Sequence, residues 1–318
     1  MALEVFRLQY EANEIYHAYV NALHVDIDRV QAIEQIPFLP IEFFKTKMVT
    51  TTTFDPEIIF ESSGTTGENT SRHYVKKLSL YQKSFLKAFE LFYGSPSDWC
   101  IIALLPGYLE RTGSSLVYMA DHLVQLSKNE HSGFYLYEYE KLYKTLCACE
   151  MKQQRVLLIG VTFALLDFAE KYSLQLHHTT IMETGGMKGR REEITRNEMH
   201  DFLKKKLGVK KIHSEYGMTE LLSQAYSHGD GIFYCPPWMK ALAREENDPL
   251  KVTTGVSREK AFGGILNIID LANIYSCSFI ATDDIGKLYS DGSFEVLGRK
   301  DNSDSRGCSL LTASQGVF

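Results

Sequence analysis

A run of six small residues, Ser62-Ser63-Gly64-Thr65-Thr66-Gly67, has the composition best suited to bind an anion. Glycine has no Cβ and tolerates a positive φ, so the backbone N–H groups of such a run can approach phosphate oxygens closely. The serine and threonine hydroxyls add further donors. The run follows the apolar residues Ile58-Ile59-Phe60, which predicts a strand that leads into a phosphate-binding loop. A plain turn has the same composition, so the run alone leaves that alternative open.

A second chemistry-bearing segment, His213–Ser223, places Tyr216 beside a glycine and then Thr219 and Glu220. An aromatic ring can stack on a base, a hydroxyl can donate to a phosphate, and a carboxylate can hold Mg²⁺. The combination therefore suits a nucleotide with its metal ion. A turn with a helix-capping threonine is the alternative reading of the same residues.

Two further segments place small or charged residues beside predicted strands. Thr184-Gly185-Gly186 follows an apolar strand, and its glycine pair leaves room for a flat ligand edge against the backbone. Asp283 and Asp284 could accept hydrogen bonds from ribose hydroxyls. Aspartates in a β-turn accept hydrogen bonds without any ligand, so a plain turn is the alternative. Arg299 opens a polar, charge-rich stretch that contains Cys308 near the end of the sequence.

The elements that must position these residues alternate between strands and helices from residue 56 onward. The predicted strands are Glu57–Phe60, Cys100–Leu105, Phe134–Tyr137, Arg155–Ile159, Thr179–Met182 and Lys211–His213. The predicted helices are Leu78–Tyr93, Ser114–Leu126, Glu138–Met151, Phe163–Tyr172 and Arg190–Leu207. Strands separated by helices imply parallel βαβ units, and nearly all-apolar strands imply helices on both faces of the sheet.

The two ends of the sequence differ from this body. Residues 1–55 predict an apolar helical stripe, and then an extended segment, broken by Pro37 and Pro40, over the surface of the body. Residues 56–228 form the expected α/β nucleotide-binding body. Residues 229–298 predict short antiparallel strands joined by turns, with a hairpin at Asp291-Gly292. Residues 299–318 are expected to form a hinge remnant and a C-terminal tail.

Composition and charge exclude several classes of function. The chain has 318 residues, is 44% hydrophobic and has a net charge of −6, which gives no support for binding to nucleic acid or anionic membranes. The N-terminus resembles no signal peptide, and no apolar run approaches the ~18 residues of a membrane span. Six cysteines without a CxxC pair predict free thiols and a cytoplasmic location.

The order of the segments resembles the ordered motifs of adenylate-forming enzymes. SSGTTG resembles the phosphate loop of that superfamily, TGG its adenine-side turn, EYGMTE its most diagnostic motif, TDDIG its ribose motif and GRKD its hinge. The resemblance covers residues 56 to 301. It implies an α/β fold in which helices cover mixed and parallel sheets, with a C-terminal antiparallel β region. Such a fold is the large domain of an adenylate-forming enzyme.

The resemblance implies that the small-residue run wraps the phosphates of ATP. The residues concerned are Ser62, Ser63, Gly64, Thr65, Thr66 and Gly67. The usual loop ends in Pro-Lys-Gly, whereas this sequence continues Glu68-Asn69-Thr70-Ser71-Arg72. Arg72 could supply the missing positive charge, because a guanidinium suits phosphate geometry.

The other motif segments would complete the nucleotide site. Gly185 and Gly186 would border adenine, Tyr216 would stack on it, and Gly217 is also expected among the nucleotide-binding residues. Asp284 and Arg299 would bind the ribose hydroxyls. Thr219 would contact a phosphate, and Glu220 would ligate Mg²⁺, so both are expected to take part in catalysis.

Within that superfamily the sequence resembles the acyl-protein synthetases of LuxE type, the fatty-acid-activating components of the bacterial luminescence fatty-acid reductase. The resemblance lies in IPFLPIEFFK, in SSGTTG followed by SRHYV, in LLPGYLERTGSSLVYM and in GRKDNSDSRGCSLL. It implies a long-chain-fatty-acid–protein ligase that uses ATP and Mg²⁺ to form acyl-AMP. Cys308 would then accept the acyl group, and a partner acyl reductase or acyltransferase subunit would receive it.

The end of the sequence departs from the superfamily pattern. Adenylate-forming enzymes usually continue past the hinge into a mobile lid that brings a catalytic lysine, but only 17 residues follow Asp301 and no lysine follows Lys300. We therefore expect the lid domain to be missing or vestigial. A carboxylate–CoA ligase of phenylacetate type and a non-catalytic nucleotide-binding scaffold subunit remain alternatives. A P-loop NTPase is disfavoured because the sequence contains no GxxxxGK[ST] motif.

Overall fold

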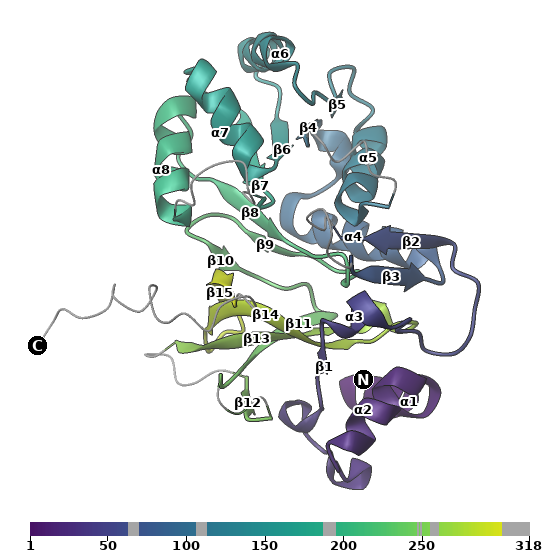
Figure 1. The fold of residues 1–318 in the computed structure, drawn as a ribbon. Coiled ribbons are helices and arrows are strands. Elements are labelled where there is room, and N and C mark those ends of the chain that lie inside the picture. The colour runs from purple at the N-terminus through teal and green to yellow at the C-terminus, as the bar shows by residue number, and fades with distance from the viewer. Residues whose placement is uncertain are drawn as a thin grey trace, which may run out of the picture.

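The computed structural model describes residues 1–62, 70–105, 113–186, 195–246, 248, 250–254 and 261–300. A six-stranded sheet with helices on its faces forms one half of the molecule, and a seven-stranded sheet with the N-terminal helices forms the other (Figure 1). The N-terminus therefore lies beside the sheet built from the C-terminal part of the chain.

The six-stranded sheet has the order β5-β4-β6-β7-β8-β9. Its strands are β4 Cys100–Leu104, β5 Gly133–Phe134, β6 Val156–Gly160, β7 Thr179–Glu183, β8 His213–Tyr216 and β9 Ala225–Ser227. Strands β5 to β8 run parallel and β9 is antiparallel to β8, which confirms the predicted βαβ units. Strand β8 begins at His213, the last residue of the predicted strand Lys211–His213. The predicted bounds of this strand were therefore wrong.

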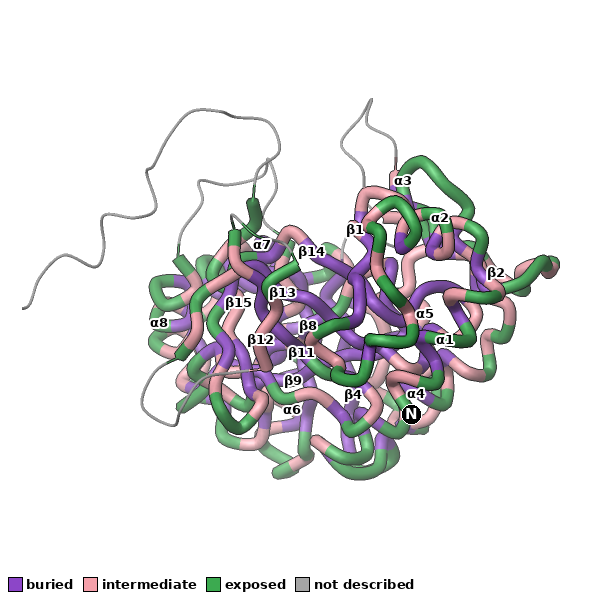
Figure 2. The backbone as a smooth tube through the Cα atoms, turned by 90° about the horizontal axis from the view of Figure 1, so that it is seen from below, coloured by how far each residue is buried: buried purple, intermediate pink, exposed green. Residues whose placement is uncertain are grey.

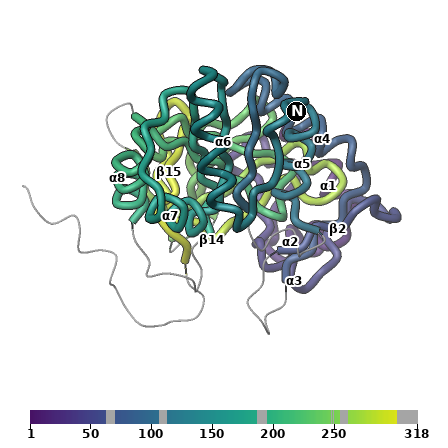
Figure 3. Tube along the Cα trace, turned by 90° about the horizontal axis from the view of Figure 1, so that it is seen from above, coloured from purple at the N-terminus to yellow at the C-terminus, as the bar shows by residue number. Residues whose placement is uncertain are grey.

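Helices cover both faces of this sheet. They are α4 Leu78–Tyr93, α5 Ser115–Ser127, α6 Tyr139–Met151, α7 Thr162–Lys171 and α8 Arg196–Leu207. Alternate residues of β6 divide between the faces: Val156 and Leu158 pack with α6, α7 and α8, whereas Leu157 and Ile159 pack with α4 and α5. Seen from above, α7 and α8 lie on the side of β15, and α4 and α5 lie on the side of the N-terminal helices (Figure 3).

The predicted strand Glu57–Phe60 lies outside the parallel sheet. Strand β2 (Ile58–Glu61) pairs antiparallel with β3 (Arg72–Val75) in a separate two-stranded sheet. The expectation that this strand belongs to a parallel βαβ unit was therefore wrong. The pairing depends on the segment SRHYV, which contains β3. The small residues that precede this segment make its strand pattern difficult to recognise in the sequence. Glu61 and Arg72, which stand before and after the small-residue run in the sequence, are consequently paired in one hairpin.

The C-terminal sheet has the order β10-β15-β14-β13-β11-β12. Its strands are β10 Ile232–Phe233, β11 Met239–Arg244, β12 Val252–Thr253, β13 Phe262–Asp270, β14 Phe279–Leu288 and β15 Phe294–Arg299. The predicted hairpin is confirmed, since Gly292 at φ 84° lies between β14 and β15. The predicted turn at Asp283-Asp284 is absent: both residues belong to β14, where long-range pairing with β13 and β15 overrides their turn preference.

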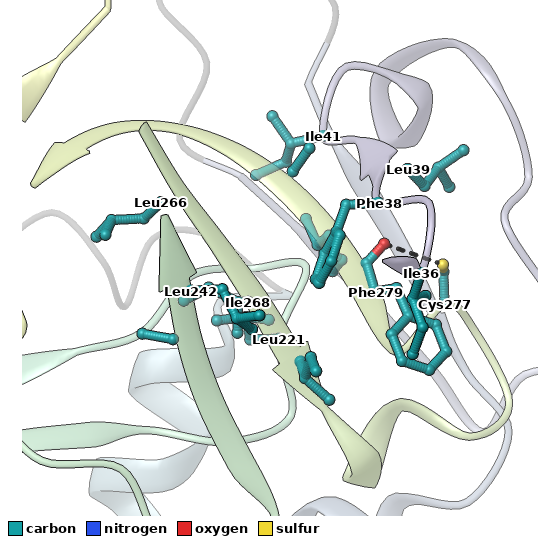
Figure 4. Close-up of a cluster of buried hydrophobic side chains, with 14 of the residues drawn as sticks. Ile36, Phe38, Leu39, Ile41, Leu221, Leu242, Leu266, Ile268, Cys277 and Phe279 are labelled. Atoms are coloured by element: carbon teal, nitrogen blue, oxygen red, sulfur yellow. Dashed lines mark hydrogen bonds between the residues drawn. The ribbon is translucent and has the colours of Figure 1, made fainter. Parts of the chain in front are cut away.

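The N-terminal segment is part of the core of this sheet. Its elements are α1 Ala2–Ala12, α2 Glu14–Ala22, β1 Leu39–Pro40 and α3 Phe43–Thr46. Strand β1 pairs in parallel with β14, which places Leu39 opposite Ile280. Leu39 is fully buried and Phe38 is 5% exposed, in an apolar cluster shared with Phe279 (Figure 4). The expectation of a surface course for this segment was therefore wrong, because its apolar residues fill the face of the C-terminal sheet.

Short 3₁₀ helices complete the architecture: Ile27–Arg29, Ile33–Gln35, Pro96–Asp98 and Leu271–Asn273. The strands of both sheets are mostly buried, and the exposed residues lie on outer helices and loops (Figure 2). In the described ranges no helix is long and apolar enough to cross a membrane. The division at residues 55, 228 and 298 stays a prediction about domains.

Candidate active site

Three motif residues from distant parts of the sequence meet between the two large sheets. The hydroxyl of Tyr216, at the end of β8, donates a hydrogen bond of 2.8 Å to Oδ2 of Asp284 on β14. Nε of Arg299 lies 3.5 Å from Oδ1 of the same carboxylate. Asp284 and Arg299 are opposite each other in the β14–β15 register, so the hairpin itself brings them together. The TDDIG and GRKD segments thus join EYGMTE at one site.

Burial raises the pKa of the Asp284 carboxyl, and the neighbouring Arg299 charge and Tyr216 hydroxyl lower it in part. Tyr216 is 8% exposed, and its ring lies edge-on to the ring of Phe294, with the two ring centroids 5.2 Å apart. This packing holds the Tyr216 hydroxyl in place. A carboxylate that retains free acceptor capacity beside an arginine can bind ribose hydroxyls. The predicted stacking of Tyr216 on adenine stays a prediction.

Glu220 lies in the same region. Its side chain is 5% exposed, and burial raises its pKa, while a hydrogen bond from Ser71 and the charge of Arg299 act in the opposite direction. Asn273 donates a 2.7 Å hydrogen bond to the backbone oxygen of Glu220, which fixes the peptide that carries the carboxylate. The negative charge of Asp284 further raises the Glu220 pKa, so a cation at this point would relieve the repulsion.

The β2–β3 hairpin brings Ser62 and Ser71 to this region. The backbone N–H of Ser71 donates to Oγ of Ser62 at 2.9 Å, and Ser62 N donates to the backbone oxygen of Ser71 at 3.0 Å. Arg72 is 57% exposed and forms a 3.2 Å ion pair with Glu61. The predicted phosphate contacts of Ser63, Gly64, Thr65, Thr66 and Gly67 fall outside the described residues.

His73 connects the same hairpin to the EYGMTE segment. Its Nδ1 lies 2.8 Å from the backbone oxygen of Thr219, so Nδ1 carries the hydrogen and donates it. Burial lowers the pKa of His73 to about 4, which keeps the ring neutral. Ser71 and His73 thus place the hairpin directly against Thr219 and Glu220. Sequence reasoning missed both residues, although they stand in the segment SRHYV that carries part of the family resemblance.

The turn after β7 is built around a buried acid that sequence reasoning also missed. Glu183 is 3% exposed, and its Oε2 accepts a 2.7 Å hydrogen bond from Gly185 N. Gly185 and Gly186 have φ values of 74° and 94°, which only glycine adopts without strain. Among the described residues, a Cβ at Gly185 would meet no atom within 4 Å. That Gly185 and Gly186 border a ligand stays a prediction. The signal was an acid at the end of an apolar strand.

These residues fit ATP and a magnesium ion. Magnesium prefers oxygen ligands and takes one or two carboxylates with phosphate oxygens and water. Glu220 offers such a carboxylate beside the hairpin whose loop is expected to bind phosphate. Within the described ranges no three His, Cys, Asp or Glu residues group as metal ligands, so ATP oxygens and water would complete the coordination.

Cys308, the predicted acyl acceptor, falls outside the described residues.

Two comparisons concern the sequence. A family model described as LuxE, acyl-protein synthetase, matches residues 1–316. A curated relative, the long-chain-fatty-acid–luciferin-component ligase of Aliivibrio fischeri, is 24% identical over 336 residues, which cover 98% of this chain and 86% of the relative. The match therefore extends over nearly the whole of both sequences.

Solved structures of adenylate-forming enzymes share the fold. ATP-bound MatB from Rhodopseudomonas palustris has a TM-score of 0.54 at 16% identity over 78% of this chain and 50% of that one. O-succinylbenzoate coenzyme A synthetase from Bacillus subtilis, in complex with ATP and magnesium ion, has a TM-score of 0.51 at 13% identity, over 86% and 55% of the two chains. This chain thus spans about half the length of these structures. With a family model that matches almost every residue, the chain belongs to the LuxE family of acyl-protein synthetases.

Proposed function

We propose that this chain uses ATP and Mg²⁺ to activate a fatty acid, including a long-chain one, as acyl-AMP and then transfers the acyl group to a protein cysteine. The observation that carries this proposal is the convergence of Tyr216, Asp284, Arg299 and Glu220 at the base of the β2–β3 hairpin. Three motif segments, EYGMTE, TDDIG and GRKD, thereby line one site. The relative from Aliivibrio fischeri, a ligase of long-chain fatty acids by its name, supports the class of substrate.

In the proposed first step, a carboxylate oxygen of the acid attacks the α-phosphorus of ATP. A new P–O bond forms, the bond between the α-phosphorus and the bridging oxygen breaks, and pyrophosphate leaves. Asp284 and Arg299 hold the ribose, and Thr219 and the small-residue run hold phosphate oxygens. Glu220 holds the magnesium ion, which when bound neutralises charge on the phosphates. Gly185 and Gly186 leave space for the adenine, against which Tyr216 lies. Gly217 keeps its own backbone close to the nucleotide, and Arg72 adds positive charge.

In the proposed second step, a cysteine thiolate attacks the acyl carbonyl, the C–O bond to AMP breaks and a thioester forms. The thiolate is the reactive form, so its proton passes to solvent or a nearby base beforehand. We assign this role to Cys308. Among the described cysteines, burial raises the pKa of Cys100, Cys235 and Cys277 to about 12 and also raises that of Cys149. Such thiols are poor nucleophiles near neutral pH.

The thioester would serve a partner acyl reductase or acyltransferase subunit in the cytoplasm. The name of the relative, a luciferin-component ligase, supports a place in a multi-component system. The partner would take the acyl group from the thioester by reduction or by transfer to another nucleophile. Co-purification of a tagged chain from its native host, followed by mass spectrometry, tests this part of the proposal.

Exchange of labelled pyrophosphate into ATP tests the first step, because it requires reversible formation of acyl-AMP. We expect exchange that depends on the acid when the full chain is given ATP, Mg²⁺ and a panel of carboxylic acids. The panel is run with and without the candidate partner. Nucleotide binding without exchange under either condition would instead support a scaffold subunit.

A carboxylate–CoA ligase is the second candidate, because one structural neighbour is by its name a coenzyme A synthetase. Both functions share the acyl-AMP step and differ in the thiol that accepts the acyl group. Chromatography of reactions that contain coenzyme A separates them. Accumulation of acyl-CoA without acylated protein would favour the ligase over the acyl-protein synthetase.

A further inference from the structure

A buried polar cluster lies on the face of the six-stranded sheet opposite to Tyr216. Glu215 on β8 is the direct cross-strand neighbour of Tyr226 on β9, so both side chains project from the same face. Successive residues of a strand point to opposite faces, so Glu215 points away from Asp284 and towards the α4 side. Its charge raises the pKa of Tyr81 and Tyr93, both on α4, which places the carboxyl among these hydroxyls. We call Glu215, Gln224 and Tyr226 the polar cluster.

The polar cluster is incompletely satisfied by the described part of the chain. Gln224 is 4% exposed and Tyr226 is 1% exposed, yet Oε1 of Gln224 and the hydroxyl of Tyr226 have no hydrogen-bond partner. Glu215 is half-buried, and the charged group that acts on it is Glu183, another carboxylate. A buried polar group without a partner is destabilising, so native proteins nearly always supply one.

The polar cluster lies beside the proposed reaction site. A Cβ on Gly217 would stand 2.4 Å from Oε1 of Glu215 and 3.4 Å from Cγ of Gln224, so both side chains lie against Gly217, directly after Tyr216. The carboxylate of Glu183, which holds the Gly185 turn, is close enough to raise the pKa of Glu215. The Glu183 side chain itself points to the other face, towards Arg196 and His200 of α8. The cluster therefore lies beside the EYGMTE segment, on the α4 face of the sheet.

From this placement we infer that the acyl substrate carries a hydrogen-bond-donating group, a hydroxyl or an amino group, which binds Glu215, Gln224 and Tyr226. This inference rests on the proposed function and narrows its substrate class. The groups without partners are all oxygens, and the Gln224 amide oxygen can only accept, so the complementary ligand atom is a donor. An unsubstituted hydrocarbon chain would leave the Gln224 amide oxygen and the Tyr226 hydroxyl unpaired, and its burial there would be costly.

The test compares acids that differ only in the substituent. Butanoic and dodecanoic acids with a hydroxyl or an amino group at C2, C3 or C4 are each matched with the unsubstituted acid. Binding to the full chain is measured by calorimetry, and turnover by pyrophosphate exchange. Because a site built to hydrogen-bond a substrate rejects the analogue without that group, we expect at least one substituted acid to be preferred at least about tenfold.

Variants of Glu215 identify the group that recognises the substituent. Glu215→Met should reduce the preference at least about tenfold by either measurement. A bound ammonium group would favour the charged carboxylate of Glu215, which Gln cannot form. Glu215→Gln should therefore preserve preference for a hydroxyl-substituted acid and abolish preference for an amino-substituted acid. Glu140→Gln, on α6 at a side chain that is 73% exposed, is the matched control and should change neither.

Two outcomes overturn the inference: unsubstituted acids that bind at least as tightly as every substituted acid, or a preference that Glu215→Met leaves unchanged. These outcomes are separate from failure of the proposed function. Exchange with unsubstituted acids alone would reject the inference and keep the function. Preferential binding of a substituted acid without any exchange would keep the inference and reject the function.

Discussion

The hydroxyl of Tyr216 donates a 2.8 Å hydrogen bond to Asp284, which lies 68 residues further along the sequence. This contact joins the end of β8, in the α/β half of the molecule, to β14 in the C-terminal sheet. Both residues belong to motifs expected to contact the nucleoside of ATP. The hydrogen bond therefore couples the relative position of the two sheets to the shape of the proposed nucleotide site.

Tyr216→Phe should weaken both stability and ATP binding. The buried Asp284 carboxyl loses a donor, which should lower the free energy of unfolding by about 1–3 kcal/mol and raise KM for ATP. Urea denaturation measures the free energy of unfolding, and pyrophosphate exchange at varied ATP concentration measures KM for ATP. Tyr10→Phe is the control, since Tyr10 donates a hydrogen bond of equal length, 2.8 Å, to Asn21 at an exposed site. Equal loss of stability in both variants would contradict the assigned role.

Glu220→Gln should separate catalysis from stability. A neutral amide is a poor magnesium ligand, so exchange should fall by at least about tenfold and require more Mg²⁺. The free energy of unfolding at neutral pH should stay constant or rise, because burial already disfavours the charged carboxylate. Magnesium titration of the exchange rate and thermal denaturation test both statements. Glu90→Gln, at a 41% exposed position of α4, should leave both unchanged.

Cys308→Ser should stop acyl transfer and leave acyl-AMP formation intact. The hydroxyl of serine is far less nucleophilic than a thiolate near neutral pH, so no stable acyl-protein should accumulate. Intact-protein mass spectrometry after incubation with ATP and a fatty acid measures acylation, and pyrophosphate exchange measures activation. Cys147→Ser, a half-buried thiol on α6, is the control. Continued acylation of the Cys308→Ser variant would place the acceptor elsewhere.

Glu215 should make the stability of the protein depend on pH. Burial is the main cause that raises the pKa of Glu215 in the folded protein from its ordinary value of 4.5 to about 8, and the charge of Glu183 is the second cause. Between these values the folded protein holds a proton that the unfolded chain has lost, so stability falls as pH rises through this interval. Glu215→Gln has no such proton. Its stability relative to the wild type should therefore increase from pH 5 to pH 8.

Denaturation midpoints of both proteins at pH 5, 6, 7 and 8 measure this difference. Asp270 and Asp283 also have pKa values raised to about 6, but they titrate in both proteins and cancel in the comparison. Glu90→Gln serves as the exposed control. A constant difference between Glu215→Gln and the wild type across the range would mean that Glu215 titrates normally.

His73 should act by positioning Thr219. Asn can place an amide N–H near the position of Nδ1, so His73→Asn should keep part of the exchange activity, whereas His73→Phe should lose it by removing the donor to Thr219. The loss should fall on kcat with a smaller change in KM for ATP, because a displaced phosphate contact affects the transition state most. The same substitutions at the exposed His177 are the controls. Equal activity of the Asn and Phe variants would reject a role for the Nδ1 donor.

Local sequence patterns determined several elements of this protein. Helix Leu78–Tyr93 has its predicted bounds, because its apolar periodicity is continuous and Gly94, at φ 80°, ends it. The Asp291-Gly292 hairpin follows from turn chemistry confined to a few residues. The parallel order of β4, β6, β7 and β8 follows from the alternation of strands and helices. The order of the motif segments was likewise enough to indicate an adenylate-forming fold.

Contacts between distant segments were decided only by the tertiary structure. The pairing of β2 with β3, the burial of Leu39 beside Ile280 and the hydrogen bond from His73 to Thr219 each depend on which segments meet across the core. No local window of the sequence contains both partners, so propensity and periodicity cannot show them.

The chemistry of Glu215 shows the same division. The sequence shows a carboxyl beside the motif tyrosine, but the raised pKa of Glu215 follows from desolvation between β8, β9 and α4. The sequence therefore determined which chemical groups the site contains. The tertiary structure decided their environments, because burial and electrostatic neighbours exist only once the sheets and helices have packed.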